Sequence, residues 1–405
     1  DSMKLRNLTA ALAMAGLSLT GMSAHAGTMA DVVKIGFISD MSGVYADDDG
    51  PGGATAIQMA IDDFGGTVNG KKIQLLTADH QNKADIAAAK AREWMDQQNL
   101  DLLIGGTNSG VGLAMNAVSA EKHKIFISVG AGAADLTTTQ CQPYGIHYGY
   151  DTVALAHGTG SAVVKNGGKN WFFITADYAF GHALQRDTAA VVKSNGGTVK
   201  GSVNVPLGTT DFSSYMLQAQ SSGAQILGLA NAGGDWVNSV KAADQFGITK
   251  TMKLATLLAF LPDVHAAGQK ATQGMYLTAS WYWDLNDQTR AWSKRWEAKM
   301  HRAPSMLQAG DYSAALTYLN AVKATGTDDA DTVMKWIKSN KINDMFTHGG
   351  YVRADGTLIR DMYLMQVKTP QESKSEWDLY KVIATLPGED VFTKPADSPC
   401  KLLKK

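Results

Sequence analysis

The sequence lacks the short motifs that bind nucleotide phosphates, hold a catalytic zinc ion or position a serine nucleophile. No GxxxxGK[ST], G-x-S-x-G or H-E-x-x-H pattern occurs, and none of the nine dispersed histidines has another His or Cys at metal-ligand spacing. Gly158-Thr159-Gly160 lacks the third glycine of a dinucleotide-binding fingerprint. These absences make an enzyme less favoured, although an enzyme of unfamiliar type stays possible. No cofactor is expected.

An excess of charge of one sign is also missing. Lys and Arg number 37 against 38 Asp and Glu, which gives a net charge of −1, and the basic residues are scattered. Nucleic-acid binding therefore has little support. Beyond the N-terminal stretch, no run reaches the roughly 18 apolar residues of a membrane-spanning helix, so no other transmembrane segment is expected.

The N-terminal stretch, residues 3–26, has the three parts of a secretory signal. A basic start is followed by an apolar run at residues 8–19, which is too short to cross a bilayer, and by Ala-His-Ala at residues 24–26. We expect export to the periplasm and a mature chain from residue 27. Residues 1–2, before the first methionine, are interpreted as a cloning remnant.

Only two cysteines occur, Cys141 and Cys400. An exported chain reaches a compartment that permits disulfides, so a bond between the middle of the chain and its tail is the leading interpretation. Two unpaired buried thiols are the alternative.

Apolar runs alternate with helical patterns in the first part of the mature chain, which predicts a parallel sheet. The predicted strands cover residues 32–39, 73–78, 102–104 and 125–129. The loops that follow three of them are long or rich in glycine, at residues 40–53, 105–110 and 130–134. Because ligands bind at the carboxyl ends of parallel strands, we expect these loops to face one cleft.

Residues 102–122 carry the clearest binding signal. A short apolar strand runs through the glycine turn 105–110 into a helix, on which Val111, Met115 and Val118 share one face. Such a turn presents free backbone N–H groups and the positive end of the helix dipole to an anion. Ser109 adds a hydroxyl group. The alternative is an ordinary turn that binds nothing.

A second α/β unit of similar rhythm starts near residue 150. Its predicted strands cover residues 171–176, 199–205, 226–230, 253–258 and 275–278. Since the mature chain is too long for one ordinary core, two domains are predicted.

Helical patterns dominate after Trp281. The stripe of Trp292, Trp296 and Met300 is interpreted as core packing rather than as a ligand site. Further on, two β runs at 348–353 and 362–367 are predicted to pair as a hairpin, with the turn between them at residues 354–356.

Four segments, in order, resemble the periplasmic solute-binding proteins of the branched-chain amino-acid transporter family. Residues 34–43 (KIGFISDMSG) resemble the family's first strand and loop, and residues 103–109 (LIGGTNS) its second binding segment. Residues 177–181 (DYAFG) are similar to its aromatic turn, and residues 210–213 (TDFS) to a recurrent segment. Each motif is short, but the ordered set is fairly specific.

This resemblance implies an α/β fold of the type I periplasmic binding proteins, with two Rossmann-like lobes joined by a three-strand hinge. Lobe 1 would comprise residues 27–149 and 280–358, and lobe 2 residues 150–279 and 359–405. A ligand would be trapped between the lobes of a monomer. The closed form would be offered to the permease of an ABC importer in the inner membrane.

The resemblance also implies the binding residues. In the family a serine hydroxyl and backbone N–H groups hold a carboxylate, and Ser109 and residues 130–132 fall on these positions. A threonine that is frequent near Gly132 is missing here. Phe180 falls on a stacking aromatic residue. The predicted ligand-binding set is Ser42, Tyr45, Asn108, Ser109, Gly130, Ala131, Gly132, Tyr150, Tyr178, Phe180, Asn231, Asp235 and Trp281.

One departure from the family concerns the ligand. Amino-acid binders hold the ammonium group with an acidic side chain of the second lobe, but the matching residues 257–261 are apolar. Asp235 or Asp284 could substitute, or could be a helix cap or a surface residue. Tyr276 and residues 281–283 resemble the family branch that takes aromatic carboxylates of the hydroxycinnamate or benzoate type. The candidate aromatic walls, which could equally be core residues, are Tyr45, Tyr178, Phe180 and Trp281.

Three functions remain open from the sequence. The favoured one is a transport protein for an aromatic carboxylate, with branched-chain or other amino acids as alternative ligands. The second is a sensor that reports its ligand to a membrane receptor, and the third is a secreted enzyme. The acidic residues 47–49 would repel an anion in the cleft, so we place them on the solvated side of their loop.

Overall fold

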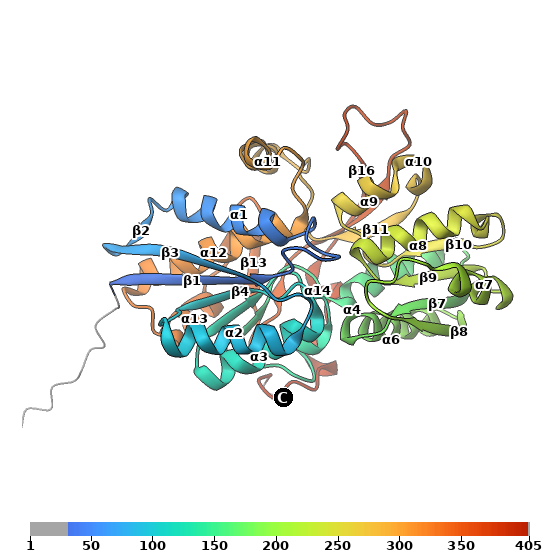
Figure 1. Cartoon of the computed structure of the whole chain (residues 1–405). Helices are drawn as coiled ribbons and strands as arrows, with labels where there is room; N and C mark the ends of the chain where they lie inside the picture. The colour runs from blue at the N-terminus through green and yellow to red at the C-terminus, as the bar shows by residue number, and fades with distance from the viewer. Residues whose placement is uncertain (1–30, 404–405) are drawn as a thin grey trace, which may run out of the picture.

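The computed structural model describes residues 31–403, which form two α/β lobes joined by short crossing segments (Figure 1). The predicted signal peptide lies outside the described residues. Within residues 31–403, no helix has both the length and the apolar character needed to cross a membrane.

The first lobe is built on a six-stranded sheet of order β2-β3-β1-β4-β5-β6. Every neighbouring pair is parallel except the edge pair, in which β2 runs antiparallel to β3. The parallel sheet predicted from the β/α alternation is therefore confirmed. The strands are β1 Val32–Ser39, β2 Thr67–Val68, β3 Lys71–Asp79, β4 Leu102–Gly105, β5 Ile125–Ser128 and β6 Gly145–His147.

Helices cover both faces of this sheet (Figure 1). Helices α2 Ala84–Gln97 and α3 Ser109–Lys122 pack against each other on one face, over Ile38, Leu103 and Phe126. Helix α1 Gly50–Asp63 packs against α12 Met306–Thr325, a helix from much later in the chain. The remaining helices of this lobe are α11 Asp287–Met300 and α13 Ala330–Ser339. Trp292 and Trp296 of α11 are buried, as predicted for a packing stripe.

The second lobe has a four-stranded parallel sheet of order β10-β9-β7-β8. Its strands are β7 Asn170–Ala176, β8 Thr198–Val205, β9 Ile226–Ala230 and β10 Lys253–Thr256. Its helices are α4 Thr152–Leu155, α5 Ser161–Lys165, α6 Ala179–Ser194, α7 Ser213–Ser221, α8 Gly233–Gln245, α9 Leu261–Ala267 and α10 Gln269–Thr272. A π-helical turn at Ala156–Gly160 separates α4 from α5.

The late β runs do not pair as predicted. Strand β13 His348–Val352 pairs antiparallel with the two-residue strand β14 Leu358–Ile359, and β12 Ile342–Asn343 lies on its other side. Strand β15 Met362–Val367 lies instead between β11 Tyr276–Ala279 and β16 Tyr380–Leu386 in a separate antiparallel sheet. The hairpin expected between residues 348–353 and 362–367 is therefore wrong, because β14 takes the place of the second strand.

The chain passes between the lobes three times, at residues 148–151, 280–286 and 360–361. The crossings lie side by side: the Arg360 guanidinium donates to the carbonyl of Ser280, and a Cβ at Gly149 would lie 3.6 Å from the Ser280 hydroxyl. Such adjacent crossings provide a hinge about which two lobes can close. The lobe boundaries given above stay a prediction.

The C-terminal tail contacts both lobes. At the end of helix α14 Gly388–Val391, the carbonyl of Val391 lies 2.8 Å from His157 Nδ1. Just after the helix, an Arg353 guanidinium N–H donates to the carbonyl of Thr393 at 2.8 Å. Cys141 and Cys400 form a disulfide across 259 residues, which agrees with the pairing expected from the sequence. The bond attaches the tail to the first lobe.

Candidate ligand-binding site

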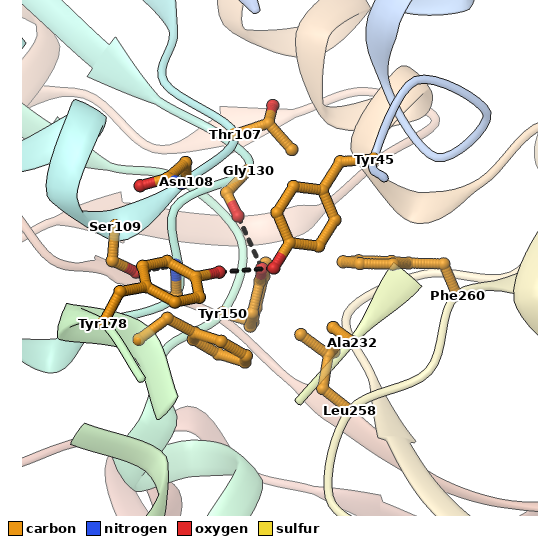
Figure 2. Close-up of a pocket in the computed structure, with 12 residues that line it drawn as sticks. Tyr45, Thr107, Asn108, Ser109, Gly130, Tyr150, Tyr178, Ala232, Leu258 and Phe260 are labelled. Atoms are coloured by element: carbon orange, nitrogen blue, oxygen red, sulfur yellow. Dashed lines mark hydrogen bonds between the residues drawn. The ribbon is translucent and has the colours of Figure 1, made fainter. Parts of the chain in front are cut away.

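A small cavity lies between the lobes, at the carboxyl ends of the parallel strands (Figure 2). It encloses about 230 Å³, including the part open to solvent. The residues that line it are Tyr45, Thr107, Asn108, Ser109, Gly130, Gly132, Tyr150, Tyr178, Phe180, Ala232, Leu258 and Phe260. None of these twelve residues has a side chain with a formal charge at neutral pH.

One wall is formed by the turn between β4 and α3. Gly105 has φ +125° and a Cβ there would lie 2.2 Å from the carbonyl of Ile38, so only glycine fits. The turn ends at Asn108, whose side-chain oxygen accepts from the Val111 N–H at 3.1 Å and caps α3. The helix N-terminus, and with it the positive end of its dipole, therefore faces the cavity.

Ser109, the first residue of α3, joins this turn to the loop after β5. Its hydroxyl oxygen accepts from the N–H groups of Gly132 at 3.2 Å and Ala133 at 3.0 Å. Both bonds use the oxygen as acceptor, so its hydrogen stays available to donate. The arrangement can hold an anion with a hydroxyl and peptide N–H groups alone.

Aromatic side chains form most of the remaining wall of the cavity (Figure 2). The hydroxyls of Tyr45, from the first lobe, and Tyr178, from the second, hydrogen-bond to one another across it. The Tyr150 hydroxyl donates to the carbonyl of Gly130 at 2.6 Å. Burial raises the pKa of all three phenols above the usual value, so they stay neutral. Phe180 packs close to Gly132, where a Cβ would lie 2.9 Å from its ring.

The lobes are in contact around this cavity. The Gly234 N–H of α8 donates to the carbonyl of Val44 at 3.0 Å, and Arg186 of α6 pairs with Asp135 of the first lobe at 3.1 Å. Together with the Tyr45–Tyr178 bond, these contacts describe a closed arrangement of the two lobes.

A family model for periplasmic binding proteins matches residues 32–374 of the sequence. The chain belongs to this family.

Solved structures agree with this assignment. The sequence is 63% identical to a periplasmic binding protein from Burkholderia mallei, covering 93% of this chain and 100% of that one, with a TM-score of 0.92. It is 39% identical to a branched-chain amino-acid ABC transporter periplasmic ligand-binding protein from Burkholderia xenovorans LB400 (92% and 100% covered, TM-score 0.81). A benzoate complex of a solute-binding protein from R. palustris shares the fold at 21% identity (91% and 99% covered, TM-score 0.80).

Curated relatives match over a shorter stretch. Leu/Ile/Val-binding protein homolog 6 of Brucella suis biovar 1 is 24% identical over 216 residues. That match spans 53% of this chain and about half, 54%, of the relative.

The cavity of this periplasmic binding protein contains most of the residues that the sequence predicted to lie together. These are Tyr45, Asn108, Ser109, Gly130, Gly132, Tyr150, Tyr178 and Phe180. They come from the loops after β1, β4, β5 and β7 and from the first crossing between the lobes. That they bind a ligand stays a prediction.

Five predicted residues do not line the cavity. Ser42 is exposed and donates to Asp79 at 2.6 Å, because its loop turns back over β3. The carbonyl of Ala131 accepts from His147 Nε2 at 2.6 Å. The Asn231 amide donates to the Ser239 hydroxyl at 2.8 Å. Asp235 accepts from the Gly208 N–H at 3.1 Å, within the second lobe. Trp281 lines a neighbouring small cavity and donates to the carbonyl of Met345 at 3.1 Å.

Four lining residues were missing from the predicted set: Thr107, Ala232, Leu258 and Phe260. Thr107 belongs to the glycine turn that the sequence singled out, so its position carried a signal. Leu258 and Phe260 lie in the apolar stretch 257–261, which by the family resemblance matches the ammonium-binding loop of amino-acid binders. Their apolar character is the signal that could have placed a hydrophobic wall there, although the predicted walls were Tyr45, Tyr178, Phe180 and Trp281.

The prediction that Asp47, Asp48 and Asp49 lie on the solvated side of their loop is wrong for two of the three. Asp47 is exposed, but Asp48 and Asp49 are at most 1% exposed. The N–H groups of Asp48 and Asp49 both donate to the carbonyl of Tyr45, which curls the loop inward. Asp49 then accepts hydrogen bonds from the hydroxyls of Ser39 and Thr107 beneath the cavity.

Proposed function

We propose that this periplasmic binding protein is the substrate-binding component of an ABC importer and that it binds a small aromatic carboxylate between its lobes. The observation that carries the proposal is the lining of the cavity, which combines an uncharged anion-holding turn with aromatic walls and contains no acidic side chain. The ligand class follows from what such a lining can and cannot stabilise.

A carboxylate fits the first-lobe side of the cavity. The free hydrogen of the Ser109 hydroxyl and the N-terminal N–H groups of α3 supply donors, and hydrogen bonds to an ionised group are about twice as strong as neutral ones. The neutral phenols of Tyr45, Tyr150 and Tyr178 add polar partners without repelling the anion. A ligand with a phenolic hydroxyl would find hydrogen-bonding partners in the same cavity.

An ammonium group, by contrast, finds no ionised partner in the lining. The nearest candidate from the sequence, Asp235, is buried within the second lobe, and that burial raises its pKa to about 7 despite the bond from Gly208. The other candidate, Asp284, pairs with Arg290 at 2.9 Å and is not in the lining. Burying an amino group without a partner costs several kcal/mol. This difference favours an aromatic acid over an amino acid.

Closure would couple binding to transport. A ligand that touches both Ser109 of the first lobe and Phe180 of the second stabilises the closed form through its extra contacts. An inner-membrane permease that recognises the closed form would then receive only loaded protein.

An amino-acid ligand is the second candidate. The 39% identical protein from Burkholderia xenovorans is named as a branched-chain amino-acid transporter component, which supports this alternative.

The test compares aromatic acids with the corresponding amino acids. 3-Phenylpropanoate differs from phenylalanine only by the ammonium group, and p-coumarate differs from tyrosine by that group and by a double bond. We expect 3-phenylpropanoate and p-coumarate to raise the melting temperature, and phenylalanine and tyrosine to leave it unchanged. A ligand at a hundred times its Kd stabilises the folded protein by about 2.7 kcal/mol, which a thermal-shift assay detects. Benzoate, leucine and valine complete the panel. Stabilisation by leucine or valine without any by the aromatic acids would contradict the proposal.

A further inference from the structure

Two aspartate side chains from opposite lobes meet at the lobe interface, beside the cavity. Asp48 lies in the loop before α1 and is 1% exposed, and Asp263 lies in the first turn of α9 and is 5% exposed. The two carboxyl groups are within hydrogen-bonding reach of each other. Neither has a basic side chain as a salt-bridge partner among the residues that the structure describes.

The hydrogen bonds of the two groups differ. One oxygen of Asp263 accepts from the N–H groups of Phe260 at 3.0 Å and Gly233 at 3.2 Å. Both oxygens of Asp48 are buried, and neither finds an N–H or O–H partner in the described part of the chain. Two ionised carboxylates in contact repel one another, whereas one shared proton turns the contact into a hydrogen bond.

The charged and titratable neighbours do not remove the need for this proton. The charge of Asp47 opposes ionisation of both groups, and the charge of Arg302 favours ionisation of Asp48. Arg302 itself donates to the backbone carbonyl of Asp47 at 2.6 Å. The buried phenols of Tyr150 and Tyr380 also lie near the pair, and both have a raised pKa and are neutral. Burial first, and the neighbouring carboxylate second, raise the pKa of Asp48; burial also raises that of Asp263.

We propose that Asp48 and Asp263 share one proton when the lobes are closed and lose it when the lobes separate, so that ligand binding is coupled to proton uptake. This inference concerns the regulation of the site proposed above and rests on that proposed function. In the open form each carboxyl faces water, is no longer beside the other, and ionises near its ordinary pKa of about 4.

The sign of the coupling follows from the proton count. Above the ordinary carboxyl pKa, the closed form binds one proton more than the open form, so lowering the pH favours closure. As the pH rises through the raised pKa of the pair, this contribution is lost, and the ligand Kd increases by up to about tenfold per pH unit.

The pair also acts on the shape of the cavity. The backbone groups that Asp263 holds belong to Phe260, a lining residue, and to Gly233, the neighbour of the lining residue Ala232. Asp263 is thus a positioning residue for the second-lobe wall, and its contact with Asp48 connects that wall to the first lobe.

The test measures affinity and proton uptake together. With p-coumarate as the probe, we expect the Kd from calorimetry to increase at least about tenfold between pH 5.5 and 8.5, where the probe's carboxyl stays ionised. Titrations at pH 7 in buffers of different ionisation enthalpy should show proton uptake on binding. In Asp48→Asn, the amide donates to ionised Asp263 and only the burial of Asp263 still raises its pKa, so the pH dependence and the uptake should become much smaller.

Two further variants make the result specific. Asp47→Asn changes an exposed neighbouring charge and should keep the wild-type pH dependence. Asp263→Asn keeps an oxygen for Phe260 and Gly233 and donates to Asp48, so it replaces Asp48→Asn if that variant fails to fold. A pH-independent Kd in the wild type, or an unchanged pH dependence in the folded asparagine variant, would overturn the proposal.

A ligand-free measurement separates this proposal from the proposed function. If neither p-coumarate nor the other aromatic acids of the panel bind at any pH, the ligand assignment is wrong. Small-angle X-ray scattering of the ligand-free protein then tests the Asp48–Asp263 pair. The radius of gyration should be smaller at pH 5.5 than at 8.5 in the wild type, and the difference should be much smaller in Asp48→Asn. Equal radii in the wild type at the two pH values would then reject the shared proton.

Discussion

At the residue scale, Ser109 has two roles that depend on different parts of one hydroxyl group. Its oxygen accepts two backbone N–H groups and so holds the loop after β5 against α3. Its hydrogen points to no acceptor within the described residues and is free for a ligand. The same atom group therefore shapes the site and supplies a donor to it.

Replacing Ser109 with alanine removes both roles. We expect Ser109→Ala to weaken ligand binding by about 1.5–3 kcal/mol, the range for a hydrogen bond to a charged group, which corresponds to roughly 10- to 150-fold in Kd. Calorimetry with the aromatic acid that stabilises the wild type would measure this. Ser221→Ala, at an exposed position in the second lobe, serves as the control. An unchanged Kd in Ser109→Ala would remove this hydroxyl from the ligand contact.

At the element scale, the N-terminus of α8 packs directly against the loop between β1 and α1. Gly233 has φ +60°, and a Cβ there would lie 2.5 Å from the carbonyl of Val44 and 2.7 Å from the Tyr45 ring. A Cβ at the next residue, Gly234, would meet nothing closer than 3.7 Å. The close approach of the two elements is possible only because residue 233 has no side chain.

The two glycines offer a matched pair of variants. Gly233→Ala should hinder closure and increase the ligand Kd more than about tenfold, a loss of roughly 1.4 kcal/mol. Because the clash is between the lobes, the melting temperature without ligand should fall only slightly. This small fall reflects the free-energy cost of placing alanine at a positive φ. Gly234→Ala should bind nearly as the wild type does. Equal affinities for the two variants would contradict the packing argument.

The elements that the sequence predicted well are those defined by local periodicity. Strands β1, β3, β4, β7 and β9 and the glycine turn before Ser109 follow from apolar runs and glycine positions along one stretch of chain. The misplaced features depend on contacts between distant segments. The burial of Asp48 requires α9, more than 200 residues later, and the position of β15 requires β11 and β16 as partners. No local pattern encodes such pairings.

The residues of the candidate ligand-binding site also divide into those with a local sequence signal and those placed by distant contacts. The first-lobe residues of the cavity come from loops whose glycines and hydroxyls are visible in the sequence. Trp281 is aromatic, as expected of a wall residue. However, its indole N–H donates to the carbonyl of Met345, and the side chain lines the neighbouring cavity instead. Which of several aromatic residues faces a ligand is decided by packing between the lobes.

At the scale of the whole molecule, the Cys141–Cys400 disulfide closes a very long loop that passes through both lobes. In the chain-entropy model, a cross-link over a longer loop restricts the unfolded chain more. The bond lies away from the cavity lining, so its contribution belongs to stability rather than to recognition.

The double variant Cys141→Ser/Cys400→Ser isolates that contribution. We expect the free energy of unfolding to fall by about 2–5 kcal/mol and the ligand Kd to change little. Urea denaturation with and without reductant would measure the loss, and the reduced wild type should match the double variant. A large change in Kd would instead mean that the tail takes part in closure.

The attachment of the tail to the first lobe has a practical consequence for measuring motion. A chain immobilised by the residues just after Cys400 would be held through its first lobe, while the second lobe remained free to swing. A dye at the exposed position Leu217, on α7 of the second lobe, would then move relative to the support each time a guest molecule arrived. The fold is thereby suited to a tethered optical sensor.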